Sequence, residues 1–242
     1  MTNPSFDLPI TGWCSPDIFV ALDGLRRCDN PWFTAGPICE IGVFHGKFLV
    51  TAHGALGGVK ALGIDVFEDV QRNIDGSGVD ESGKGLLASF RESVAKHALA
   101  PGMVSHWAMD SFDLSVNDVQ RVLDVLGTVK LFSIDGGHTA EHVVNDMNFA
   151  QQVVPQDGII LVDDMHNPHW PGVGEGLAKL YLTGSPKFAP FLFLANKLFL
   201  CGLSFHARAL ASLDQALAPL RDRIEFRPVT MYGHKAMAGI YL

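Results

Sequence analysis

The sequence lacks several features that would assign it to common protein classes. Its 242 residues include four cysteines, none in a Cys-x-x-Cys pair, which argues against a zinc knuckle and a disulfide framework. Basic residues are not in excess, because 26 acidic residues face 18 basic ones. The net charge of -8 leaves no electrostatic footprint for nucleic acid or anionic lipid. Reduced thiols and this charge favour a cytoplasmic protein whose partner is a small molecule.

A leader segment and an uninterrupted apolar run are also missing. Residues 1–4 include no cationic region followed by an apolar stretch, so no signal peptide is expected. The most apolar segment, residues 188–205, is interrupted by Pro190 and by the pair Asn196-Lys197. Such a segment is too broken to cross a membrane, so we expect a soluble protein with no membrane partner.

The chain does contain a regular alternation of short apolar runs and helical stretches. Alternation of this kind favours a doubly wound, mainly parallel sheet of the Rossmann-like α/β class. The strand-like runs lie at residues 38–41, 59–65, 103–108, 131–134 and 159–162.

The C-terminal part predicts a different arrangement. Residues 191–195 and 198–201 flank Asn196-Lys197, where Asn tolerates the left-handed backbone of a tight turn, so we expect an antiparallel hairpin at one edge of the sheet. A helix near residues 207–221 and a last strand-like segment from Ile224 follow.

The length suits one large α/β domain, which we place at residues 36–242. The aromatic-rich residues 1–35 read as an N-terminal cap or interface segment. This segment could serve as the contact of a homodimer.

Two of the strand-like runs stop abruptly at carboxylates. The first is followed by Asp135-Gly136-Gly137-His138, and the second by Asp163-Asp164. If the two strands are neighbours, about 4.8 Å apart, these carboxylates meet at one edge of the sheet. They then repel one another unless a cation lies between them or one of them holds a proton. The trio therefore predicts a divalent-metal site.

A partial nucleotide-binding motif follows the first strand. Glu40-x-Gly42-x-x-x-Gly46 has a glutamate where the full dinucleotide fingerprint has glycine. A carboxylate there disfavours a pyrophosphate, and with it an NAD-dependent oxidoreductase. It favours a cation such as the ammonium or sulfonium of S-adenosylmethionine. An ordinary glycine turn between strand and helix is the alternative.

Polar residues also follow the next two strands. Asp65 stands where such folds place an acceptor for ribose hydroxyls, although a solvated loop residue would read the same way. Asp110-Ser111 could bind the edge of an adenine, and helix capping is the competing interpretation for Ser111.

The segment His138-Thr139-Ala140-Glu141-His142 matches the inverted zinc-peptidase signature His-x-x-Glu-His. That signature needs both histidines on one face of a helix, whereas Gly136-Gly137 places His138 at the helix entrance. His138 could cap the helix there. Beside Asp135 it could instead take a proton from a metal-held hydroxyl group.

Taken together, these motifs resemble the class I S-adenosylmethionine-dependent methyltransferases. Within them the sequence is most similar to metal-dependent O-methyltransferases of the methyltransferase-24 type, related to macrolide-sugar methyltransferases and cephalosporin-hydroxylase-like proteins. The resemblance covers roughly residues 36–203 and includes Pro171-Gly172-Val173 and Asn196-Lys197-Leu198-Phe199.

The resemblance implies a role for each motif. The residues expected at the methionine part of the cofactor are Glu40, Gly42, Val43 and Gly46, with Asp65 at the ribose and Asp110 and Ser111 at the adenine. Asp135, Asp163 and Asp164 would bind Mg²⁺, Asp135 would also border the cofactor, and His138 would be the general base.

The expected activity is the metal-assisted transfer of a methyl group to a hydroxyl of a small molecule. A cofactor-binding or interaction module without chemistry and a zinc hydrolase built on His138 and His142 remain the alternatives.

Overall fold

The structure is a computed structural model that describes residues 6–69, 72 and 85–242. Five short strands alternate with helices in the first two thirds of the chain and pair in parallel in the order β3-β2-β1-β4-β5. They are β1 (Ile38–Ile41), β2 (Ala61–Asp65), β3 (Val104–Ala108), β4 (Leu131–Ile134) and β5 (Ile159–Val162). The predicted doubly wound parallel sheet is confirmed.

Two antiparallel hairpins extend this sheet to nine strands, in the further order β5-β7-β6-β9-β8. The predicted hairpin is formed by β6 (Phe188–Leu194) and β7 (Lys197–Gly202), with β7 antiparallel to β5. Its turn residues Ala195 and Asn196 have φ values of 49° and 70°, as a tight turn requires. The last strand-like segment is itself a hairpin, β8 (Ile224–Met231) and β9 (His234–Tyr241), and β8 takes the outer edge.

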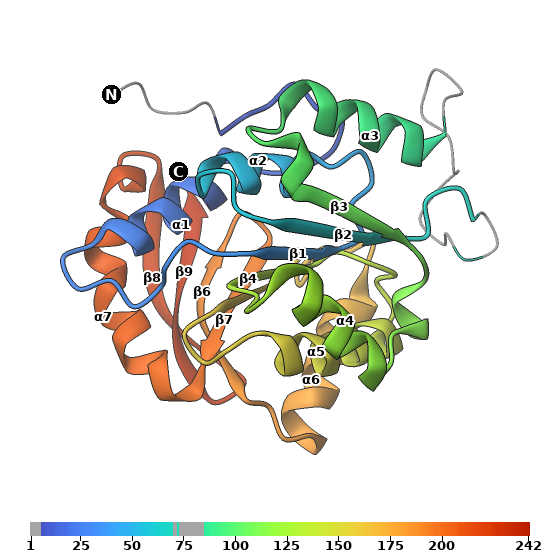
Figure 1. The fold of residues 1–242 in the computed structure, drawn as a ribbon. Helices are drawn as coiled ribbons and strands as arrows, with labels where there is room; N and C mark the ends of the chain where they lie inside the picture. The colour runs from blue at the N-terminus through green and yellow to red at the C-terminus, as the bar shows by residue number, and fades with distance from the viewer. Residues whose placement is uncertain (1–5, 70–71, 73–84) are drawn as a thin grey trace.

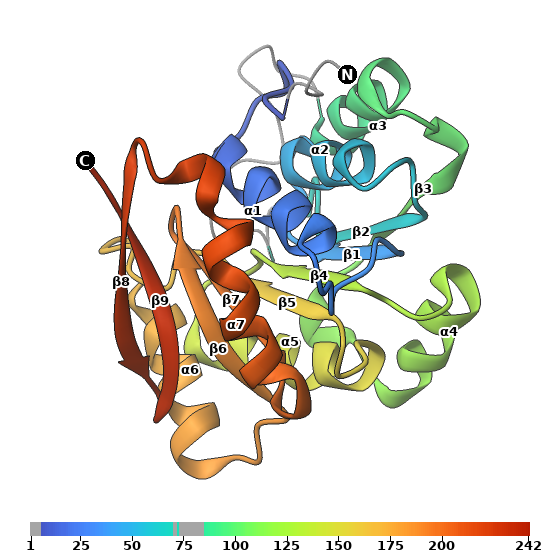
Figure 2. The same ribbon diagram turned by 90° about the vertical axis from the view of Figure 1, so that its left-hand side faces the viewer.

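Helices cover both faces of the sheet (Figures 1 and 2). One face carries α1 (Pro16–Arg27), α2 (Lys47–Ala55), α3 (Leu86–His97) and α7 (His206–Ala216). The other carries α4 (Val116–Leu126), α5 (Ala140–Val153) and α6 (Pro171–Thr183). Short 3₁₀ turns lie at Pro101–Met103, Ser111–Asp113, Leu203–Phe205 and Ala218–Leu220.

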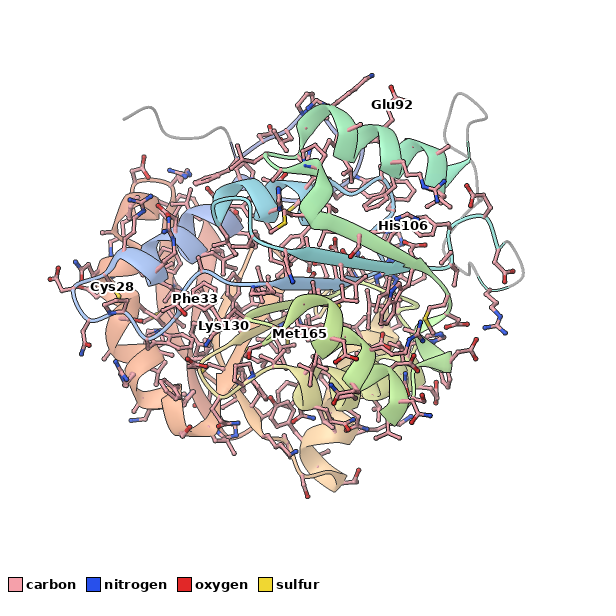
Figure 3. The ribbon with its side chains drawn as sticks, viewed as in Figure 1. Cys28, Phe33, Glu92, His106, Lys130 and Met165 are labelled. Atoms are coloured by element: carbon pink, nitrogen blue, oxygen red, sulfur yellow. The ribbon has the colours of Figure 1, made fainter. Side chains whose placement is uncertain are left out.

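Each face of the sheet has its own apolar core. Figure 3 shows side chains filling both layers between sheet and helices, with Phe33 in the first core and Met165 packed against the second. The strands β1, β4 and β5 are buried along their whole length, as expected for parallel strands covered on both faces.

Two helix starts follow the predicted capping signals. The side chain of Ser15 accepts a hydrogen bond from the backbone N–H of Asp17 at the start of α1. Ser115 and Asp118 form a capping box at the start of α4, in which Asp118 Oδ2 accepts the backbone N–H of Ser115 at 2.9 Å. These local signals explain why the two helices begin where the sequence predicts.

The strand order reverses between β1 and β4, the position where doubly wound sheets bind ligands. Gly42, directly after β1, has a φ of +78°, and a Cβ there would lie 1.8 Å from the carbonyl oxygen of Asp135. Gly46, with a φ of +88°, then begins α2 as its N-cap. The glycine turn thus brings the end of β1 against the end of β4.

Within the described residues, no helix has both the length and the apolar character needed to cross a bilayer.

Candidate active site

A cavity of about 1390 Å³ opens at the carboxyl ends of β1, β2, β4 and β5. It is larger than the roughly 300–1,000 Å³ of a typical small-molecule pocket, so it has room for two ligands. The predicted site residues that line it are Glu40, Gly42, Val43, Asp65, Asp110, Ser111, Asp135, His138, Asp163 and Asp164. Gly46 is not among the lining residues, because it packs against Phe90 as the N-cap of α2.

Glu40 lines this cavity and is only 1% exposed. Its Oε2 atom has no hydrogen-bond partner among the described residues. Burial, and next the negative charge of Asp135, raise the pKa of Glu40 well above its usual range. A buried carboxyl group with an unused oxygen fits a ligand that brings a cation or a hydrogen-bond donor.

Asp65 ends β2 and is fixed by two backbone donors. The N–H groups of Phe44 and Phe67 donate to its two carboxylate oxygens at 2.9 and 2.7 Å. Burial nevertheless raises the pKa of Asp65, and these backbone hydrogen bonds oppose that shift. The carboxylate thus lies in one orientation at the cavity wall, where an acceptor for hydroxyl groups is expected.

Asp110 and Ser111 follow β3 on the same side of the cavity. Asp110 accepts the backbone N–H of Phe112 at 2.9 Å and lies 3.7 Å from Arg72 Nη1. Ser111 is buried, and its carbonyl oxygen accepts the side-chain N–H of Asn145. Asp110 is also the N-cap of the 3₁₀ turn Ser111–Asp113, so capping and lining of the cavity occur together.

The carboxylates that follow β4 and β5 converge as predicted. Ile134 pairs with Val162, which places the residues that follow them side by side. His138 Nε2 lies 3.3 Å from Asp135 Oδ1 and 3.2 Å from Asp164 Oδ2, so the imidazole joins the two strand ends. His138 and Asp164 both have left-handed backbone conformations, with φ values of 48° and 59°. Such conformations in non-glycine residues concentrate at functional sites.

Lys197, at the start of β7, enters the same cluster from the neighbouring hairpin. Its Nζ donates to Asp163 Oδ2 and lies 3.4 Å from Asp135 Oδ2. The side chain is 2% exposed, and Nζ lies 5.1 Å from the centre of the Phe48 ring. Lys197 was predicted to be a turn residue, so its place in the cluster was missed.

These contacts act on the carboxyl groups in different directions. Burial raises the pKa of Asp135, but Lys197 and the hydrogen bond with His138 outweigh it and hold that pKa below its usual range. Burial and the Asp135 charge raise the pKa of Asp163, against the effect of Lys197. His138 and Asn167 lower the pKa of Asp164, although burial opposes them. The cluster is stable as a set of charges only because cationic or donor groups lie within it.

The donor set fits a divalent cation. Among the described residues, Asp135, His138 and Asp164 offer ligand atoms that lie within 4.8 Å of one another. Carboxylate oxygens are the ligands that Mg²⁺ prefers. His142 is not in this group, because its Nδ1 lies 2.8 Å from Thr139 Oγ1 and its Nε2 faces Asp110. This separation of His138 from His142 disfavours a zinc hydrolase.

Two tryptophans complete the cavity wall. The Trp170 ring stacks on His138 with centroids 4.7 Å apart, and Trp13 stacks on Phe44 at 6.2 Å. Trp13 is 89% exposed, which is unusual for so large an apolar ring. The exposed ring belongs to residues 11–15, which line the cavity although they are distant in sequence from its other walls.

Comparisons with known proteins agree with this geometry. A family described as a methyltransferase domain matches residues 39–165, just over half of the chain. Curated protein sequences give no significant match. Among solved structures, the chain is similar to the O-methyltransferase NovP, with 15% identity over 76% of this chain and 79% of that one and a TM-score of 0.54. It is also similar to the calicheamicin methyltransferase CalS11, with 17% identity over 76% and 78% of the two chains and a TM-score of 0.50.

At these identities the solved structures establish a shared fold, which confirms the Rossmann-like class predicted from the alternating strands and helices. The family match begins in β1 and ends just after Asp163-Asp164, so it contains both the glycine turn and the carboxylate cluster. The chain belongs to this family of methyltransferase domains, as its motifs predicted.

Proposed function

We propose that the protein is an S-adenosylmethionine-dependent O-methyltransferase that acts on a hydroxyl group of a small molecule, assisted by a divalent cation. The observation that carries this proposal is the meeting of Asp135, Asp164 and His138 beside a cavity that Glu40 also lines. The family match supports methyl transfer, and the geometry of the cluster supports oxygen as the acceptor atom.

The methionine end of the donor would lie at Glu40 and the turn from Gly42 to Phe44. The unpartnered Oε2 of Glu40 suits the α-ammonium group of S-adenosylmethionine, and the Asp65 carboxylate suits its ribose hydroxyls. The adenine would lie toward Asp110 and Ser111. S-adenosylmethionine supplies a methyl group already activated by its sulfonium, so the protein has to align the two reactants and prepare the acceptor.

A divalent cation bound here would lower the pKa of a hydroxyl group that it holds. Asp135 and Asp164 would hold the cation through oxygen atoms. His138, whose imidazole lies between these carboxylates, would be the general base for the acceptor hydroxyl. A positioned base contributes roughly 10²- to 10⁴-fold to the rate. The Trp170 ring stacked on His138 keeps the imidazole in place and excludes water from one side of it.

The charge of the cavity limits the acceptor. Lining carboxyl groups outnumber lining lysine and arginine side chains, of which Lys197 is already bound to Asp163. A divalent cation held among these carboxyl groups would offset part of their charge. A vicinal diol or sugar that could chelate the cation therefore fits best as the acceptor.

Calorimetric titration with S-adenosylmethionine tests the proposal. We expect saturable binding, and its absence at high micromolar concentration would contradict the proposed function. In an assay with candidate hydroxyl acceptors, Asp135→Ala and His138→Ala should lose turnover by about 10²-fold or more while they keep their affinity for the donor. A parallel loss of donor binding would place these two residues in the cofactor site or in the fold instead.

A further inference from the structure

The three carboxylates that follow β4 and β5 are not equivalent. Both oxygens of Asp163 are occupied, because Oδ1 accepts the backbone N–H of Asp164 at 2.9 Å and Oδ2 accepts Lys197 Nζ. Asp135 lies 3.3 Å from His138 and 3.4 Å from Lys197, and its carboxyl group also hydrogen-bonds with that of Asp163. Asp164 Oδ1 accepts the side-chain N–H groups of Asn167 at 2.9 Å and of Asn196, and its Oδ2 lies 3.2 Å from His138 Nε2. Asp164 thus contacts amide and imidazole groups, whereas Asp163 contacts a buried lysine at close range.

Lys197 cannot easily leave this position. Its side chain is 2% exposed, and its ammonium group lies over the Phe48 ring. Lys197 is also the first residue of β7, so its backbone is part of the sheet. Val162 pairs with Leu198 across β5 and β7, which holds the backbone of Lys197 beside that of Asp163. A buried ammonium group that moved away would leave a carboxylate and itself without a partner, which is costly in an apolar environment.

The charges of the cluster support the same division. When ionised, the three carboxylates carry three negative charges, of which Lys197 compensates one. The remaining two equal the charge of one divalent cation. The cluster of ligand atoms that lie close enough for one ion contains Asp135, His138 and Asp164, and Asp163 is outside it.

We propose that Lys197 acts as a permanent cation of the active site. By pairing with Asp163, it leaves Asp135 and Asp164, next to His138, as the carboxylates that bind the divalent ion, and its charge lowers the affinity for that ion. This inference rests on the proposed function, because it concerns the same ion. It makes Lys197 a positioning residue, since it acts on the ion through the carboxylates.

Binding of Mn²⁺, followed by electron paramagnetic resonance of the free ion, tests this role without an activity assay. Removal of the competing charge in Lys197→Met should tighten Mn²⁺ binding by about tenfold or more. Lys130→Met is the matched control: Lys130 pairs with Asp157 at 2.6 Å before β4, at the opposite end of the strand from Asp135, and its removal should leave Mn²⁺ binding unchanged.

Two double variants of equal charge keep the test valid if Lys197→Met does not fold. Lys197→Met with Asp163→Asn removes the ion pair, and should bind Mn²⁺ within about threefold of the wild type. Lys197→Met with Asp164→Asn removes a proposed ligand, and should bind at least tenfold more weakly. Equal affinities of these two variants, or no Mn²⁺ binding by the wild type and every variant, would overturn the role of Lys197.

Titration of the same samples with S-adenosylhomocysteine separates this inference from the proposed function. If the wild type binds S-adenosylhomocysteine but the variants do not show the expected differences in Mn²⁺ affinity, only the role of Lys197 is refuted. If the wild type does not bind S-adenosylhomocysteine, the proposed function is refuted.

Discussion

Two buried carboxyl groups, Glu40 and Asp146, each have one oxygen without a partner among the described residues. Their surroundings differ. Glu40 faces the large cavity, whereas Asp146 borders a space of about 10 Å³, which is close to the volume needed for a single water molecule. A ligand can therefore satisfy Glu40, while Asp146 depends on a proton or on one enclosed water molecule.

Glu40→Gln should weaken the binding of S-adenosylmethionine by roughly 10- to 100-fold, because it removes a charge-assisted hydrogen bond. Calorimetry measures this change. The matched control is 5′-methylthioadenosine, which has no amino-acid end and should bind equally well to the wild type and the variant. An equal loss for both ligands would show that the substitution disturbs the cavity in general.

Asp146 predicts a pH dependence of stability. Burial raises its pKa to about 7, although the side chains of Ser111 and Asn145 lower it in part. The folded state therefore holds a proton that the unfolded chain releases near pH 4, so this contribution to stability is complete below pH 4 and is lost as the pH rises to about 7. The shift corresponds to on the order of 4 kcal/mol. Denaturant unfolding from pH 4 to 8 should show a smaller decline for Asp146→Asn, and an unchanged decline would assign the effect to other groups.

At the scale of elements, the glycine turn after β1 is what brings two strand ends together. Gly42 and Gly57 both have left-handed backbones, with φ values of +78° and +90°. A Cβ at Gly42 would collide with the backbone of Asp135, whereas one at Gly57 would have no atom within 4 Å. A comparison of the two positions thus separates the free-energy cost of a left-handed backbone from the cost of a steric clash with the backbone of Asp135.

Gly57→Ala should lower the free energy of unfolding by about 1–2 kcal/mol, the cost of a left-handed alanine. Gly42→Ala should lower it by at least ~2 kcal/mol more, because the ends of β1 and β4 must move apart. Chemical denaturation of both variants measures the difference. Equal costs would mean that the turn relaxes without disturbing β4.

The elements with local signals were predicted closely from the sequence. The helix from Pro16 to Arg27 was predicted correctly because Ser15 caps it. The start of α4 was predicted correctly because Ser115 and Asp118 form a capping box there. The carboxylates converged as predicted because neighbouring parallel strands end at one edge. Lys197 was missed, since its place beside Asp163 depends on the pairing of β7 with β5, for which the sequence contains no local signal.

At the scale of the whole molecule, we propose that residues 6–35, the described part of the N-terminal segment, cap the domain that follows from residue 36. The carboxylate of Asp17 in α1 accepts hydrogen bonds from Arg223 Nη2 at 2.7 Å and from the Tyr241 hydroxyl at 2.9 Å. Trp32 Nε1 donates to Ser212 Oγ at 3.1 Å, and its ring contacts Phe191 edge-on. The N-terminal segment is thus hydrogen-bonded to α7 and to the region of the last hairpin, and residues 11–15 line the cavity.

This arrangement predicts that the segment serves both stability and the site. A chain that begins at residue 36 should lose cooperative unfolding, because the buried side chains of α1, Trp32 and Phe33 belong to the same core as those of α2 and α7. Trp13→Ala is the matched control within the segment: the ring is 89% exposed, so the free energy of unfolding should change by no more than about 0.5 kcal/mol. Thermal and denaturant unfolding of the three proteins tests this contrast. A truncated chain as stable as the full one would show that the segment is a separate appendage, and strong destabilisation by Trp13→Ala would show that its exposed ring contributes to folding rather than to the cavity wall alone.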